Sequence, residues 1–214
     1  GTGRSFASIG FNMVGRSYSL SKNFRTTTQI SQAAYSLIEG CREIVEDENF
    51  VKPSLIDRQG QYPVQKSFRD ETAQAEFICH EIRQLLDSYP EKDIAIIARF
   101  KSQLQSIKRF LESDGLKCGF FTRQETTFET DSIKLITMHS IKGLEFPVVF
   151  IIGLDNRVLP YYSTADPETR MEEELQERRL LYVGMTRATE MLYLTSSSSP
   201  SKFLSDINPR YLRI

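Results

Sequence analysis

Residues 94–98, Ile94-Ala95-Ile96-Ile97-Ala98, are a continuous apolar run that follows a proline and a cluster of charged residues. A run without polar alternation is typical of a strand whose two faces are both buried, as in a parallel sheet. Similar runs occur at 133–137, 148–152 and 191–195. Together these runs predict the centre of a mainly parallel sheet.

Segments with helical periodicity separate the runs. Residues 26–28 supply threonines that suit a helix N-terminus, and Asp70 can cap the helix that follows. Asp166-Pro167 opens a charged helix that we expect to continue to about Ala188. Strands that alternate with helices predict an α/β fold whose parallel sheet is covered on both faces.

The N-terminal part is organised differently. Residues 1–16 have no firm periodicity, and we expect a connector or a truncated edge there. Residues 17–20 are a short candidate strand, and 62–68 alternate like a strand at a sheet edge. We expect residues 17–214 to form one domain, because a chain of this size can bury a single core without disulfides or metals.

Composition excludes several classes of protein. Lys and Arg number 27 against 28 Asp and Glu, which excludes a histone-like basic coat but allows a local basic stripe. Three scattered cysteines and two histidines make a zinc site improbable and suit a reducing compartment. No apolar run reaches the ~18 residues of a membrane span, and the N-terminus lacks a signal-peptide pattern. We therefore expect a cytoplasmic protein without a membrane partner.

The first group of polar residues with possible chemistry is Asn23-Phe24-Arg25-Thr26-Thr27. Ligands of open α/β sheets bind beyond the carboxyl ends of the strands, so an arginine that follows a strand could meet a ligand there. An arginine at a helix start is more often solvated or salt-bridged, however, and short matches are weak. Alone, Arg25 does not decide the function.

The second group is Thr137-Met138-His139-Ser140-Ile141-Lys142-Gly143-Leu144-Glu145-Phe146, between two predicted strands. Gly143 permits close approach of a backbone, and loops on a rigid sheet often carry binding groups. His139 alone would be an ordinary loop histidine. The ten residues in this order carry far more weight than any one of them.

The third group is residues 177–188, E-R-R-L-L-Y-V-G-M-T-R-A. Its leucines can face a core, whereas Arg179, Tyr182 and Arg187 are expected to need a polar outlet. The acidic run at 172–174 favours an amphipathic helix with a charged outer face.

Arg187 is the residue of this group that suits phosphate, because a planar guanidinium matches two phosphate oxygens. We expect it to project from the surface near the carboxyl-terminal edge of the sheet, close to Arg25. The structural alternative is that it folds back on Glu190, its acidic neighbour in sequence.

In this order, N-F-R-T-T, I-A-I-I-A-R, T-M-H-S-I-K-G-L-E-F and R-R-L-L-Y-V-G-M-T-R-A resemble the C-terminal half of UvrD/Rep-type superfamily 1 DNA helicases, over about residues 18–194. The resemblance implies a RecA-like, P-loop-NTPase-type domain with helices on both sheet faces. In that family, two RecA-like domains clamp ATP and Mg²⁺ between them, and single-stranded DNA crosses both domains. The first domain carries the phosphate loop and the Mg²⁺ ligands.

The resemblance also implies roles for single residues. Arg25 resembles the arginine that reaches the terminal phosphate, and Arg187 resembles the arginine finger. Glu145, with Gly143 nearby, resembles the acid that contacts the nucleotide ribose. The residues that resemble DNA-facing positions are Thr137, His139 and Arg99.

Two departures qualify the resemblance. The sequence has no G-x-x-x-x-G-K-[ST] loop to hold phosphates, so we expect the first motor domain to lie elsewhere in a longer protein and this fragment to be inactive alone. Only about ten residues, Thr122 to Asp131, stand where UvrD and Rep insert a large subdomain. This resembles a compact branch, such as helicase IV or the RNA-polymerase-associated HelD proteins.

Three functions remain open from the sequence. The leading one is the second motor domain of an ATP-driven DNA helicase or translocase. The second is an ATP-driven remodeller of a protein complex such as RNA polymerase, which would use the same motor without unwinding duplex. A non-catalytic interaction domain is disfavoured because Arg25, Glu145 and Arg187 are all present.

Overall fold

The computed structural model describes residues 26–50, 52, 57–121 and 131–214. Their strands form one sheet in the order β1-β6-β5-β2-β4-β3, and every neighbouring pair is parallel. The mainly parallel sheet predicted from the apolar runs is thus confirmed. The strands are β1 (Val64–Ser67), β2 (Ile94–Ala98), β3 (Cys118–Phe120), β4 (Ile133–Thr137), β5 (Phe146–Ile151) and β6 (Ala188–Ser196).

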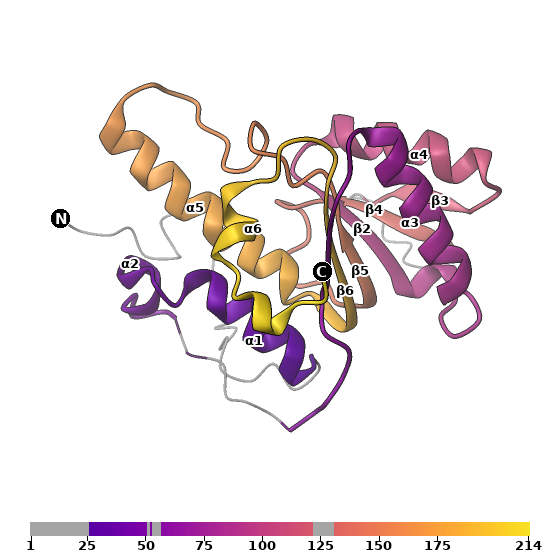
Figure 1. Cartoon of the computed structure of the whole chain (residues 1–214), viewed down its shortest axis with the longest axis horizontal. Coiled ribbons are helices and arrows are strands. Elements are labelled where there is room, and N and C mark those ends of the chain that lie inside the picture. The colour runs from indigo at the N-terminus through magenta and orange to yellow at the C-terminus, as the bar shows by residue number, and fades with distance from the viewer. Residues whose placement is uncertain (1–25, 51, 53–56, 122–130) are drawn as a thin grey trace.

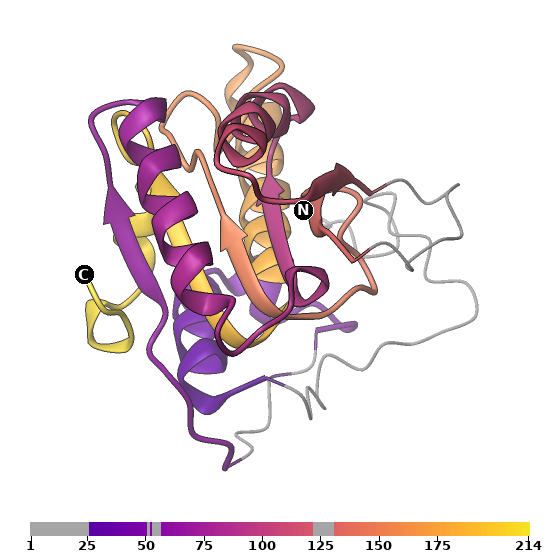
Figure 2. The same cartoon turned by 90° about the vertical axis from the view of Figure 1, so that its right-hand side faces the viewer.

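Helices cover both faces of this sheet. Figures 1 and 2 show α3 and α4 on one face and α1, α5 and α6 on the other. Side chains of Thr27, Asp70 and Asp166 cap α1, α3 and α5 by accepting from main-chain amides, as the sequence predicted. The helices are α1 (Thr28–Ile38), α2 (Arg42–Val45), α3 (Glu71–Leu85), α4 (Lys101–Ser113), α5 (Pro167–Met185) and α6 (Lys202–Asp206).

The core consists of two apolar layers, one on each side of the sheet. Strand β2 contributes to both layers because its side chains alternate: Ile94 and Ile96 pack toward α3 and α4, and Ala95 and Ile97 pack toward α1 and α5. Every residue of β2 is fully buried. A strand buried on both faces has no solvent side, which is why its sequence is a continuous apolar run.

The boundary between α5 and β6 differs from the prediction. Helix α5 ends at Met185 rather than near Ala188, and β6 begins at Ala188 rather than at Met191. Ala188 is already paired with Phe146 of β5. The short edge strand β3 was not predicted, because its residues are only half-buried and leave no apolar run.

The charged outer face that the acidic run suggests for the first turns of α5 does not extend to its C-terminal half. Arg178, Arg179 and Tyr182 are all buried. Arg178 donates to the carbonyl oxygen of Leu37 and forms an ion pair with Asp206. Arg179 forms an ion pair with Asp47 at 3.3 Å.

The buried contacts of Arg178 and Arg179 follow from the packing of α5. The C-terminal half of α5 packs against α1 and α2, so the guanidinium groups of Arg178 and Arg179 contact protein carbonyl and carboxylate oxygens. In the described ranges, no helix is long and apolar enough to cross a membrane.

Candidate functional site

The candidate residues divide between the two edges of the sheet. Because all paired strands run in the same direction, residues that end or follow a strand lie at its carboxyl edge, and residues that precede a strand lie at its amino edge. Arg99 follows β2 and Thr137 ends β4. Glu145 directly precedes β5, and Arg187 directly precedes β6. The site is therefore two clusters.

At the carboxyl edge, Arg99 forms a two-point ion pair with Glu177 of α5. Its Nε lies 2.9 Å from one carboxylate oxygen, and its Nη2 lies 2.9 Å from the other. The side chains are only 11% and 8% exposed. Such fork-to-carboxylate geometry fixes the orientation of the guanidinium.

Aromatic rings surround this pair. The Arg99 guanidinium lies 4.7 Å from the centre of the Phe100 ring and 5.7 Å from that of Tyr161. The two rings meet edge to face at 5.3 Å, and Tyr161 is 45% exposed. The main-chain N–H of Tyr161 donates to Glu177 at 3.1 Å. An exposed ring beside a fixed cation is suited to a polymer with flat bases and a negatively charged backbone, because the ring can stack on a base while the cation contacts a phosphate.

Thr137 and His139 complete the carboxyl-edge cluster. Thr137 donates its hydroxyl to Ser140 at 3.1 Å. His139 is exposed at the surface. Partial shielding from water and the positive charge of Arg99 lower the pKa of His139, whereas Glu177 acts in the opposite direction. His139 thus shares the electrostatic environment of the Arg99–Glu177 pair.

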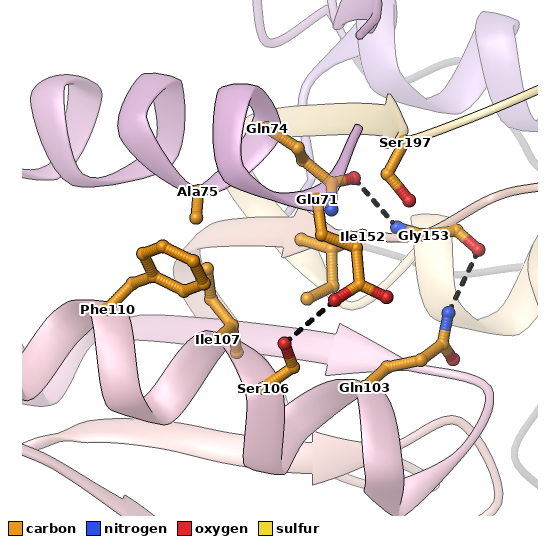
Figure 3. A pocket seen from close by; sticks show the side chains of 10 residues that line it. All are labelled: Glu71, Gln74, Ala75, Gln103, Ser106, Ile107, Phe110, Ile152, Gly153 and Ser197. Atoms are coloured by element: carbon orange, nitrogen blue, oxygen red, sulfur yellow. Dashed lines mark hydrogen bonds between the residues drawn. The ribbon is translucent and has the colours of Figure 1, made fainter. Parts of the chain in front are cut away.

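The loop that carries Tyr161 is held at its start by two glutamines. Gln74 of α3 accepts from the N–H of Gly153 at 3.0 Å, and Gln103 of α4 donates to its carbonyl oxygen at 3.1 Å. Figure 3 shows both contacts beside a pocket that residues of α3, α4 and the loop after β5 line. Gly153 has φ +62°, a conformation that favours glycine.

Gln103 also accepts from the N–H of Phe100 at 3.0 Å. It therefore ties the loop after β2, which carries Arg99, to the loop after β5. This contact joins the two loops that make the carboxyl-edge cluster.

At the amino edge, the second and third sequence groups are hydrogen-bonded to each other. The N–H of Phe146 donates to the carbonyl oxygen of Arg187 at 3.0 Å, and Phe146 is paired with Ala188. Glu145 and Arg187, each one residue earlier, are consequently neighbours on adjacent strands. A tight turn with Gly143 at φ +79° precedes Glu145, and Leu144 donates to Ile141 across it at 3.0 Å.

The expected position of Arg187 at the carboxyl-terminal edge is wrong. Arg187 precedes β6 instead of following a strand, so the chain direction puts it at the amino edge. Its Nε donates to the carbonyl oxygen of Val183 at 3.2 Å, and its Nη2 donates to Thr186 at 3.3 Å. Glu190, the acid suggested as its structural partner, instead contacts Tyr89 and Arg58.

Arg25 and the candidate strand 17–20 lie outside the described residues. Thr26, the next residue, donates its hydroxyl to the carbonyl oxygen of Ala188 at 2.6 Å. Thr26 therefore places the end of the first sequence group at the amino edge, next to Ala188, which directly follows Arg187.

The second sequence group runs from one cluster to the other. Thr137 ends β4 at the carboxyl edge, and Glu145 begins the approach to β5 at the amino edge. The segment between them contains no helix, and its Met138 and Ile141 are buried in the core. Parallel strands are usually joined by a longer, helical crossover, so this short connection is unusual. Its two buried side chains anchor it in the core.

From the sequence, no role was predicted for Glu177, although it begins the third group, and Phe100 and Tyr161 were not singled out. Glu177 lies three and four positions before Leu180 and Leu181, on the face of α5 that enters the core. That spacing was a signal of burial. Nothing in the sequence brings Tyr161 close to Arg99.

The parallel α/β sheet with helices on both faces is a RecA-like fold. Residues 18–128 and 122–199 match the family model described as the UvrD-like helicase C-terminal domain. The chain belongs to that family.

Relatives and a solved structure agree with this assignment. The chain is 46% identical to the ATP-dependent DNA helicase PcrA of Bacillus subtilis over 88 residues, which are 41% of this chain and 12% of the relative. It is 30% identical to PcrA of Staphylococcus epidermidis over 193 residues, 84% of this chain and 25% of the relative. The C-terminal domain of a possible DNA helicase from Lactobacillus plantarum WCFS1 has the same fold, with a TM-score of 0.65, 19% identity and coverage of 88% of this chain and 96% of that one. The chain thus spans a quarter or less of these two curated relatives.

Proposed function

We propose that this chain is the second motor domain of an ATP-dependent DNA helicase or translocase. The observation that carries the proposal is the pairing of Phe146 with Ala188, which makes Glu145 and Arg187 neighbours at one edge of the sheet. The names of the PcrA relatives, ATP-dependent DNA helicases, support the same activity for the whole protein.

The amino-edge cluster is the proposed nucleotide side. Arg187 acts as the arginine finger and neutralises charge on the transferring phosphoryl group, and Arg25 reaches the terminal phosphate. Glu145 accepts a hydrogen bond from a ribose hydroxyl, and Gly143 allows the nucleotide to approach the backbone of the turn closely. A guanidinium beside a carboxylate fits the anionic and hydroxylic parts of ATP. Mg²⁺ and the phosphate loop belong to the first motor domain, which supplies the other half of the cleft.

The carboxyl-edge cluster is the proposed single-stranded DNA side. Arg99 contacts a phosphate, the exposed ring of Tyr161 stacks on a base, and Thr137 and His139 line the same track. Fixed cations with aromatic platforms are the usual means of binding single strands without sequence preference.

The segment from Thr137 to Glu145 is the proposed link between the two sides. Because Met138 and Ile141 anchor it in the core, a displacement at the DNA end is transmitted to the turn at Gly143 rather than absorbed by a loose loop.

The experiment is steady-state ATP hydrolysis by the full-length protein, with and without oligothymidylate. We expect hydrolysis that depends on single-stranded DNA and is lost in Arg187→Ala. Hydrolysis that ignores DNA would contradict the DNA track, and full activity of Arg187→Ala would contradict the nucleotide side.

The second candidate is a remodeller of a protein complex such as RNA polymerase. It is favoured by the short sequence from Thr122 to Asp131, which leaves no room for the inserted subdomain of UvrD and Rep. Strand separation on a tailed duplex by the full-length protein supports the helicase. Capture of RNA polymerase without strand separation supports the remodeller.

A further inference from the structure

We infer that Glu177 is a positioning residue for single-stranded DNA: it holds Arg99 so that the free side of the guanidinium faces the phosphate backbone. The inference rests on the proposed DNA role of the carboxyl-edge cluster and names the group that makes this role possible.

Two of the three guanidinium nitrogens of Arg99 already donate to protein. Nε and Nη2 both donate to Glu177. Among the described residues, Nη1 has no acceptor within hydrogen-bond distance, and it is not a buried unsatisfied atom. One side of the fork is therefore bound to protein and the other is available to an anion, as a guanidinium with five N–H groups permits.

Glu177 is itself held in place by contacts with two loops. Its carboxylate accepts from Arg99, in the loop after β2, and from the N–H of Tyr161, in the loop after β5. Glu177 is rigid because it belongs to the buried half of α5. The carboxylate of Glu177 thus fixes the position of the Arg99 guanidinium and of the main chain at Tyr161.

The Arg99–Glu177 pair orients a hydrogen-bond donor rather than attracting DNA through its charge. A carboxylate beside Arg99 cancels its charge at long range, so the pair adds little to the general attraction of DNA. What the pair provides is a donor of fixed direction, which forms a hydrogen bond to phosphate without first losing side-chain freedom. Shortening Glu177 without changing its charge tests this directly.

The experiment compares Glu177→Asp with Glu173→Asp in the full-length protein. Glu173 is one turn away on α5 and contacts Ser163 rather than Arg99, so it is a matched control. We expect Glu177→Asp to weaken binding of fluorescent oligothymidylate about tenfold, within the range for a charge-assisted hydrogen bond. The Glu173→Asp variant should bind normally.

Two readouts distinguish positioning from a merely structural role. In an Arg99→Gln background, Glu177→Asp should cause no further loss of affinity. The half-saturating DNA concentration for ATP hydrolysis should rise in Glu177→Asp, while the rate at saturating DNA stays within about twofold of wild type, because an affinity lost before chemistry leaves turnover intact.

The possible failures are separable. If Arg99→Gln weakens DNA binding but Glu177→Asp does not, the positioning role is overturned and the proposed function stands. Equal losses with and without Arg99 also overturn it. If Arg99→Gln itself binds normally, the DNA role of Arg99 and this inference fall together. Should Glu177→Asp not fold, Glu177→Gln takes its place, and it should speed dissociation of DNA only when Arg99 is present.

Discussion

The main-chain amide of Phe146 donates to the carbonyl oxygen of Arg187 over 3.0 Å. This hydrogen bond joins β5 and β6 at their first residues, ahead of a register shift between Phe146 and Val148, and it connects the two sequence groups with the strongest family resemblance. Glu145 and Arg187, each one residue earlier, therefore lie next to each other at the amino edge of the sheet.

The 214-residue chain should not hydrolyse ATP on its own. Its sequence contains no phosphate loop, so half of the electrostatic environment for phosphoryl transfer is missing. Phosphate release by the purified chain, with Mg²⁺ and oligothymidylate, should equal the blank, while the full-length protein assayed in parallel turns over. Release above the blank that Arg187→Ala abolishes would contradict this prediction.

His139 should titrate below the ~6.5 of an ordinary histidine, because partial shielding and Arg99 disfavour its charged form. The sign follows for each perturbation. Arg99→Gln removes a positive charge and should raise the pKa, whereas Glu177→Gln removes a negative charge and should lower it. Bound single-stranded DNA brings phosphate near and should raise it.

Proton NMR of the two histidines follows this titration. The signal of His80, on the outer side of α3, should not move when DNA is added. A His139 midpoint that DNA leaves unchanged would contradict its position on the DNA track.

Gly153→Ala should lower the free energy of unfolding by about 1–2 kcal/mol, the cost of a left-handed conformation for a residue with a Cβ. Gly153 has φ +62°, and the added Cβ would clash with Nε2 of Gln103. Displacing Gln103 would also loosen its contact with Phe100. Urea unfolding measures the difference.

Gly40→Ala is the matched control, since a Cβ added at Gly40 would meet open space and the residue has no positive φ. Equal stability of the two variants would contradict the predicted cost of the left-handed conformation and of the clash with Gln103.

The sequence predicted the sheet and the helix starts well, for a physical reason. The strands near Ile94 and Val148 are buried on both faces, and a cap such as Asp70 acts within one turn, so both leave local patterns. The edge strand β3 leaves none, because its residues are half-buried.

The candidate site was predicted only in part. Its members could be named from their order, but not the edge of the sheet on which each lies. Arg187 was expected at the carboxyl edge, but it directly precedes β6, and a residue that precedes a strand of a parallel sheet lies at the amino edge. The partner of Arg99 is 78 positions away in sequence, and no local pattern connects such residues.

The role of Arg187 gives the sharpest prediction about catalysis. An arginine finger acts when the two motor domains close on ATP, and supplying one is worth about 10³–10⁵ in rate in related nucleotide hydrolases. Arg187→Lys should be nearly as damaging as Arg187→Ala, because an ammonium cannot span two phosphate oxygens. Nucleotide affinity should fall much less than turnover, since the contact strengthens in the transition state.

The measurement is ATP hydrolysis by full-length Arg187→Lys at saturating single-stranded DNA, alongside nucleotide binding. Arg69→Lys is the control, because the side chain of Arg69 is 87% exposed and, among the described residues, forms its ion pair with the neighbouring Asp70. A rate for Arg187→Lys within about threefold of wild type corresponds to less than ~1 kcal/mol of transition-state stabilisation. In that case Arg187 would have a structural role, to which its contacts with Val183 and Thr186 at the end of α5 contribute.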